Sequence, residues 1–463
     1  MNDINENFRY LNVGLPEDIA RLKAWGDIDE AVRLIDLRLK EDIPAPLRGC
    51  FVAEREMMQR LKDDFTLDLD QAMAQAQDRV SGFTKAEFDA LADKGRIDWI
   101  YLNGEKRYFK RFVNTLIKTH PDIRERAVQR HREKGGAEPE QAPAGEHILD
   151  RSMRLMRERG ELSNYIRIKA SVKISDAAFE KGRRARVWLP IPAACPQQSE
   201  IELLSFSDEP KHISPLDAPQ RTVCFERVLD ENREFFVEYS YVHTARYCDP
   251  SSIRADAVQP RDFLNEENPH IVFTPYLRAI TQDLLRGTDD PVEKARRIFG
   301  FVTGKVKYSF MPSYFVLENI AENAARNFKG DCGVQALLFI TLCRLAGIPA
   351  RWQSGLCCEP YDVGAHDWAM FYIAPHGWLF ADPSYGGSAH RAGNEARRWH
   401  YFGNLDPYRM VANCEFQHPF DPPMIHWRAD PYDNQTGEIE YEDRSLRSRE
   451  YERDQVMSEY KEL

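Results

Sequence analysis

The sequence predicts an α+β protein made of three consecutive sections. The first section repeats apolar residues at helical spacing, the second alternates apolar and polar residues, and the third mixes both patterns. At 463 residues the chain is too long for one compact core, so two or three domains are expected. Hydrophobic residues make up 43% and aromatic residues 11% of the chain, which indicates a globular protein with a substantial core.

The N-terminal section, residues 1–131, is predicted to be a helical domain. Its clearest apolar stripe has three- and four-residue spacing and consists of Ile28, Ala31, Val32, Ile35 and Leu39. Asn103-Gly104 lies between two aromatic runs, which favours either a small hairpin or a tight turn between helices. No residue pattern in this section indicates a particular chemistry, so its role is open.

A linker and a connecting helix are predicted for residues 132–161, followed by a β-rich domain over 162–250. Residues 132–146 are rich in Gly, Pro, Ala and charge without periodicity, which is typical of a linker. Period-two alternation then predicts an antiparallel sheet or a β-sandwich. The apolar positions of the first and last alternating runs are Ile166, Ile168, Ala170, Val172 and Ile174, and Phe235, Val237, Tyr239 and Tyr241.

The third section, residues 262–425, is predicted to be the core that carries the chemistry. Asp290, Pro291 and Glu293 occupy the cap, first and third positions of a predicted helix, each in its favoured place. The remaining residues, 426–463, are dense in charge and are predicted to form a solvated helix or a partly disordered C-terminal tail.

Composition excludes several classes of function. A formal net charge of −11 argues against a nucleic-acid-binding protein, which needs a basic face. No apolar run reaches the roughly 18 residues of a membrane helix, and the N-terminus lacks a basic region followed by an apolar core, so neither a membrane partner nor a signal peptide is expected. Nine scattered cysteines suit a reducing compartment, which predicts a cytoplasmic protein. No phosphate loop or dinucleotide fingerprint occurs, and no cofactor is expected.

Cys332 is the candidate nucleophile. It follows a predicted turn at Gly330-Asp331 and precedes an apolar helical pattern formed by Val334, Leu337, Leu338, Thr341, Leu342 and Leu345. A cysteine at a helix N-terminus lies beside unpaired N–H groups and the positive end of the helix dipole, which stabilise a thiolate and can hold an oxyanion. The alternative is a buried cysteine that only packs, but Gly330 and Gly333 allow a substrate to approach closely and favour catalysis.

His366 and Asp382 are the candidate base and orienting residue. His366 begins one alternating strand, Asp382 ends the next, and Pro375-His376-Gly377 forms the predicted turn between them. The two ends of such a hairpin meet, so the carboxylate could hold the imidazole in the tautomer of a base. A purely structural hydrogen bond between the two is the alternative. His376 is the rival base, although its turn position predicts that it faces solvent.

The other cysteines show no spacing typical of a metal site. Cys343 lies about three helical turns beyond Cys332, roughly 16 Å away, so the two cannot share a metal or a disulfide and Cys343 is predicted to be core. Cys357-Cys358 and His366 are close in sequence, but vicinal cysteines rarely bind one ion together and no typical zinc spacing occurs. No metal site is therefore predicted.

The runs GDCGVQALLFITLCRLAGIPAR and HDWAMFYIAPHGWLFADPSYG resemble the core of the transglutaminase-like superfamily over residues 265–390. The resemblance implies a papain-like fold, in which a helix that begins with the cysteine packs on an antiparallel sheet. It also implies Cys332 as nucleophile, His366 as base and Asp382 as orienter. The β-rich section resembles the β-domain that precedes this core in bacterial members.

One departure concerns the oxyanion. Transglutaminases are expected to use a Trp upstream of the Cys, but no Trp occurs between Trp188 and Trp352. Tyr308 is the nearest aromatic donor, with Gln335 as the second candidate. Because no calcium loop or amine site is recognisable, the sequence favours a cysteine-dependent amide or peptide-bond hydrolase that acts on a peptide, protein or amide substrate through a thioester. The alternatives are a protein-glutamine transamidase and a non-catalytic scaffold that retains the fold.

Overall fold

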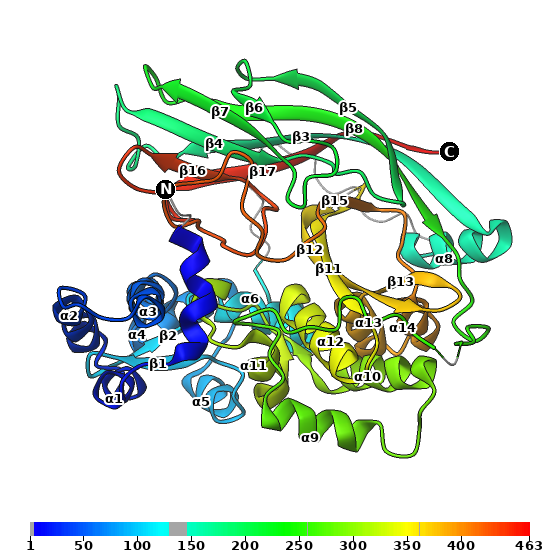
Figure 1. Ribbon diagram of the computed structural model, residues 1–463, viewed down its shortest axis with the longest axis horizontal. Coiled ribbons are helices and arrows are strands. Elements are labelled where there is room, and N and C mark those ends of the chain that lie inside the picture. Colours follow the sequence, from blue (N-terminus) through cyan, green and yellow to red (C-terminus); the bar gives the residue numbers. More distant parts are fainter. Residues whose placement is uncertain (1–3, 129–145, 257, 361) are drawn as a thin grey trace.

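The computed structural model describes residues 4–128, 146–256, 258–360 and 362–463 (Figure 1). Helices of the N-terminal section and of the core lie on one side of the molecule, and the long strands of the β-rich section lie on the other. Most of the predicted linker falls outside the described residues, and the connecting helix is α8 (Ile148–Arg159). Among the described residues, no helix combines the length and the apolar character needed to cross a membrane.

The N-terminal section is helical apart from one hairpin. Its elements are η1 (Ile4–Val13), α1 (Glu17–Trp25), α2 (Ile28–Arg38), α3 (Ala45–Asp64), α4 (Leu69–Arg79), α5 (Lys85–Asp93), β1 (Trp99–Leu102), β2 (Glu105–Tyr108), α6 (Phe112–Thr119) and α7 (Pro121–Glu125). The hairpin joins antiparallel β1 and β2 through Asn103 and Gly104, whose φ angles of 50° and 84° suit its turn. The sequence had left open whether this turn joined strands or helices.

The β-rich section is a sandwich of two four-stranded sheets. One sheet has the order β16-β4-β7-β6 and the other β17-β3-β8-β5. Their facing residues share one apolar core, which includes Ile166, Val187 and Tyr239. The strands are β3 (Glu161–Ile174), β4 (Arg184–Pro190), β5 (Gln198–Phe206), β6 (His212–Ile213), β7 (Thr222–Val228), β8 (Glu234–Arg246), β16 (Glu438–Tyr441) and β17 (Tyr451–Glu462).

The C-terminal segment corrects the prediction of a solvated helix or disordered tail. β16 pairs with β4, and β17 pairs antiparallel with β3 along most of its length. Charged residues dominate β17 because it is an edge strand, where charge protects the open hydrogen-bonding groups from other chains. The prediction failed because the high charge density was interpreted as disorder. An edge strand tolerates many charged residues, and the apolar residues between them, such as Tyr451 and Val456, are compatible with a strand.

The core is a five-stranded sheet of order β14-β13-β12-β11-β15, covered on one face by α12 (Cys332–Leu345). The buried face of α12 packs with Ala369 and Phe371 of β12 and with the surrounding helices. This is the predicted arrangement of a cysteine-bearing helix on an antiparallel sheet. The strands are β11 (Ala350–Glu359), β12 (Asp362–Ile373), β13 (Gly377–Ala381), β14 (Phe402–Gly403) and β15 (Arg409–Asn413). The other elements are α9 (Pro275–Leu284), α10 (Pro291–Lys305), β9 (Lys307–Tyr308), η2 (Tyr314–Val316), α11 (Ile320–Asn327), β10 (Lys329–Gly330), α13 (Pro383–Arg391) and α14 (Glu395–His400).

The helical domain packs on the segment between β9 and α11. The Phe310 N–H donates to Thr115 Oγ1 at 3.0 Å, and the Ser313 N–H donates to Asp64 Oδ2 at 2.7 Å. The guanidinium of Arg111 lies 4.1 Å from the centre of the Phe310 ring. Because this segment directly follows Tyr308 and precedes Cys332, the helical domain supports the loops around the candidate site.

Candidate active site

Cys332 is the first residue of α12, and its side chain is half-buried. Asp331 caps the helix by accepting a hydrogen bond from the Val334 N–H at 3.4 Å. The N–H groups of Cys332 and Gly333 belong to the first turn, where a helix has no internal acceptors for them. A Cβ atom at position 333 would lie 2.5 Å from the Tyr314 hydroxyl, so only glycine fits there without a shift.

The Cys332 thiol donates to Oδ2 of Asp367 at 3.1 Å. The other oxygen of Asp367 accepts from Nε2 of Gln435 at 2.5 Å, and the same amide donates to the His366 carbonyl at 3.1 Å. Asp433 also hydrogen-bonds Asp367, carboxyl to carboxyl. Two carboxylates in contact repel unless they share a proton, so this pair holds a proton beside the thiol.

Burial and two nearby acids oppose ionisation of the Cys332 thiol. Burial, followed by Asp367 and Asp331, raises the pKa of Cys332. Burial also raises the pKa of Asp433 to about 7 and that of Asp331 to about 6. The sequence had predicted a thiolate stabilised by the helix N-terminus. In the structure, burial and the two neighbouring acids outweigh the helix dipole, and the thiol is protonated.

His366 and Asp382 are in direct contact, with 2.7 Å between Nε2 and Oδ2. Asp382 also lies 3.0 Å from Nη2 of Arg409, which in turn pairs with Asp406 at 2.5 Å. The side chains of Asp382 and Arg409 are fully buried, at 0% exposure, so both charges depend on their partners. The ring centre of Tyr385 lies 4.8 Å from that of His366 and covers it.

The surroundings set the protonation of this pair. Burial favours the neutral acid, but His366 and Arg409 outweigh it and hold the pKa of Asp382 below its usual range. Burial lowers the pKa of His366, although Asp382 opposes that effect. An ionised Asp382 can only accept a hydrogen bond, so Nε2 of the neutral imidazole carries the proton. The free lone pair of the imidazole, with which it could accept a proton, is then on Nδ1.

His366 and Asp367 are neighbours in β12, so their side chains leave the strand on opposite faces. Asp367 lies on the face of β12 that packs on α12, together with Ala369 and Phe371. His366 lies on the opposite face with Trp368, and the centres of these two rings are 6.0 Å apart. Within the described part of the chain, no hydrogen bond joins Cys332 to His366. The three predicted residues therefore form two contacts, Cys332–Asp367 and His366–Asp382.

Of the two predicted oxyanion donors, Tyr308 is the better placed. The Lys118 ammonium lies 4.0 Å from the centre of its ring. Burial, followed by the nearby Cys332 and Asp331, raises the pKa of Tyr308, which keeps its hydroxyl protonated and able to donate. Gln335 instead donates its amide to the Gly330 carbonyl at 2.9 Å and is fully buried, so its N–H is already engaged.

The remaining candidates lie apart from these contacts. His376 is exposed in the β12–β13 turn, where its Nε2 lies 3.1 Å from the Arg254 backbone. Cys343 lies in α12 and is fully buried in the core, as predicted. Cys357 faces the Gly364 carbonyl, whereas Cys358 accepts a hydrogen bond from Tyr241 in the sandwich.

Sequence reasoning missed Asp367, Arg409, Asp433, Gln435 and Lys118. The first could have been found, because strand alternation assigns it the face opposite to that of His366. The other four come from segments far from Cys332 in sequence, and no local pattern marks them.

Comparison with known proteins finds a family model that matches part of the core. Residues 278–383 match the model of the transglutaminase-like superfamily. A comparison with curated proteins finds no match. Solved structures with similarity include a candidate cysteine protease from Cytophaga hutchinsonii, with 14% identity, a TM-score of 0.38 and coverage of 65% of this chain and 91% of the other. The periplasmic domain of TgpA from Pseudomonas aeruginosa has 16% identity and a TM-score of 0.29, covering 53% and 94%. A candidate protease from Parabacteroides distasonis has 12% identity and a TM-score of 0.21, covering 56% and 69%.

A helix that begins with cysteine and packs on an antiparallel sheet defines the papain-like class of fold. Within that class, the segment 278–383 is a transglutaminase-like core, as its sequence motifs had indicated.

Proposed function

We propose that the protein is a cysteine-dependent hydrolase of amide or peptide bonds, with Cys332 as nucleophile, His366 as base and Asp382 as the residue that orients the base. The observation that carries the proposal is the 2.7 Å contact between His366 and a buried, ionised Asp382, in the same core as a cysteine that begins a helix. This contact leaves Nδ1 of a neutral imidazole available to accept a proton.

In the proposed reaction, substrate binding brings the Cys332 thiol within reach of Nδ1 of His366, which requires a rearrangement at the start of β12 because the two side chains contact opposite faces of that strand. The thiol proton passes to Nδ1 while sulfur attacks the carbonyl carbon, and the N–H groups of Cys332 and Gly333 with the Tyr308 hydroxyl stabilise the oxyanion. The imidazolium then protonates the amine, the carbon–nitrogen bond breaks, and the acyl group remains on Cys332 as a thioester. Water, deprotonated by His366, attacks the thioester and releases the acid and the free thiol.

The experiment is to trap the thioester. Wild type, Cys332→Ala and the control Cys343→Ala are incubated with peptide and amide libraries, quenched in acid and analysed by mass spectrometry. We expect an acyl adduct on Cys332 in wild type and in Cys343→Ala, and none in Cys332→Ala. An absence of any adduct and of any product, with all variants folded, would favour the scaffold alternative.

A labelled amine in the same reactions separates hydrolysis from transfer. Hydrolysis predicts that free acid accumulates without incorporation of the amine. Incorporation of the amine at the expense of the acid product would instead identify a transamidase.

We further propose that the protein works in a reducing compartment, the cytoplasm. All nine cysteines lie in the described part of the chain and none is in a disulfide, although Cys357 and Cys358 are adjacent. Thiol quantification in protein denatured without reductant should find nine free thiols per chain.

A further inference from the structure

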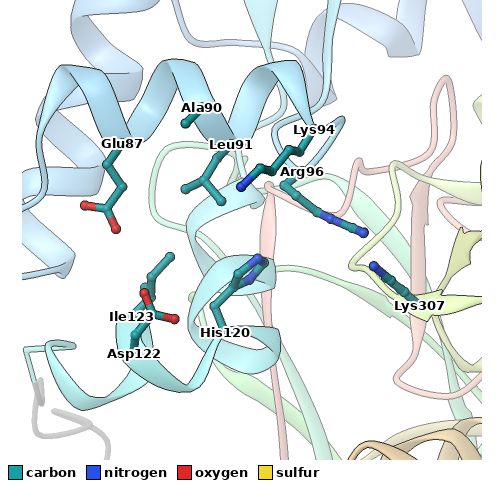
Figure 2. A pocket seen from close by; sticks show the side chains of 9 residues that line it. All are labelled: Glu87, Ala90, Leu91, Lys94, Arg96, His120, Asp122, Ile123 and Lys307. Carbon is teal, nitrogen blue, oxygen red and sulfur yellow. The ribbon is translucent and has the colours of Figure 1, made fainter.

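A cavity of about 680 Å³ lies where the helical domain meets the core (Figure 2). It is bounded by the end of α5, the α6–α7 junction and β9. Its volume lies within the roughly 300–1,000 Å³ of small-molecule sites. The lining residues are Glu87, Ala90, Leu91, Lys94, Arg96, His120, Asp122, Ile123 and Lys307.

The cavity has an excess of positive charge. In the residues that the structure describes, Lys94, Arg96 and Lys307 have no acidic partner. Figure 2 shows the guanidinium of Arg96 and the ammonium of Lys307 pointing towards each other, with the His120 ring across the cavity from this pair. These groups belong to both domains, since Lys307 is in β9 and the others are in the helical domain.

Both acids of the cavity contact the same cation, Arg126, which lies outside the lining residues. Glu87 accepts hydrogen bonds from two nitrogens of Arg126, one of them at 3.3 Å. Asp122 also lies 3.9 Å from Nη2 of Arg126. Neither acid forms an ion pair with Arg96 or Lys307 among the described residues, and with Arg126 included the four cations outnumber the two acids.

The pKa shifts of Lys307 and His120 agree with an excess of positive charge in the cavity. Arg96, more than burial, lowers the pKa of Lys307. Burial, followed by Arg96, lowers the pKa of His120. Like charges held this close without a counter-ion repel each other, and a bound anion would relieve the repulsion.

We propose that this cavity binds a small ligand through a phosphate or carboxylate group held by Arg96, Lys307 and His120. The guanidinium can bind two oxygens of such a group at once, while the ammonium and the imidazole donate to the others. A bound ligand would join the helical domain to Lys307 of β9, and the other residue of β9, Tyr308, lies near Cys332. The proposal goes beyond the proposed function and requires no catalytic activity.

Calorimetric titration of the full chain at low ionic strength tests the proposal, with inorganic phosphate and succinate as separate probes. The site variants are Arg96→Gln and Lys307→Gln. Lys305→Gln is the matched control, because Lys305 is an exposed cation two residues away that does not line the cavity. We expect saturable binding of at least one probe to wild type and to the control, weakened about tenfold or more in each site variant. The tighter probe identifies the ligand group.

Thermal melting gives a second readout that does not depend on heat of binding. The bound probe should raise the melting temperature of wild type and of Lys305→Gln, and should have little effect on Arg96→Gln. Circular dichroism verifies that each variant is folded. An absence of saturable binding of either probe to wild type, or equal affinity in all four proteins, would overturn the proposal.

Discussion

Cys332 donates its thiol hydrogen to Asp367, the residue that directly follows His366 in β12. One strand thus presents two proton acceptors on opposite faces, a neutral imidazole and a carboxyl group. The thiol occupies the carboxyl side, which raises its pKa, rather than the side of the base. Under the proposed function this conformation corresponds to a resting enzyme, in which burial first and Asp367 second raise the pKa of the thiol.

Replacing Asp367 should make Cys332 more reactive. Asp367→Asn keeps an oxygen for Gln435 but removes the ionisable carboxyl group that accepts the thiol hydrogen 3.1 Å from sulfur and raises the pKa of Cys332, so that pKa should fall. We expect iodoacetamide to alkylate Cys332 about tenfold faster near neutral pH, because one pKa unit changes the thiolate fraction tenfold. Asp262→Asn, at an exposed site outside this cluster, is the control and should react like wild type. Equal rates in all three proteins would mean that Asp367 does not govern the thiol.

Asp433 should make the protein less stable as pH rises. Its pKa is about 7 in the folded state against an ordinary value of 3.8, so the folded state binds more protons between those two pH values. Stability from this group is fully present below the ordinary pKa and is lost as pH rises through the folded value. Asp433→Asn cannot ionise, and its urea midpoint should fall less than that of wild type between about pH 5 and 8. Parallel pH profiles would contradict the shared proton with Asp367.

The sequence contained enough information to predict the contacts between residues that a short turn or a single helix start brings together. Cys332 begins its helix because a turn and an apolar helical pattern meet there, and His366 meets Asp382 because the two strands are joined by a short turn. The carboxyl pair could not be predicted in this way. Asp433 and Gln435 come from a segment that appeared to be a charged tail, and only the pairing of β16 and β17 with the sandwich brings them to β12.

A similar limit applies to charge. Arg409 is fully buried between Asp382 and Asp406, and nothing in its local sequence distinguishes it from a surface arginine. The helix dipole argument for Cys332 was sound in direction, but the nearby acids and burial decide the outcome.

Removing the buried cation should cost far more stability than removing an exposed one. Arg409→Met leaves Asp382 and Asp406 buried without their partner, which should lower the free energy of unfolding by about 3–5 kcal/mol. Arg286→Met is the control, since Arg286 pairs with Asp283 at 3.0 Å on the surface and should contribute little. Urea unfolding followed by circular dichroism measures both. Similar losses in the two variants would show that the buried network is not important for stability.

Tyr308 should act on the rate of acylation and not on substrate binding. Its hydroxyl stays protonated beside Cys332 and can donate to an oxyanion, so Tyr308→Phe removes an interaction that exists only when the carbonyl oxygen becomes charged. For a substrate found by thioester trapping, we expect kcat to fall about 10²-fold with KM nearly unchanged. Tyr276→Phe, whose hydroxyl donates to the Ala325 carbonyl away from Cys332, is the matched control and should retain full activity. If Tyr308→Phe also retains full activity, the oxyanion is held by the N–H groups of Cys332 and Gly333 alone, and Tyr308 only supports Lys118 at the edge of the site.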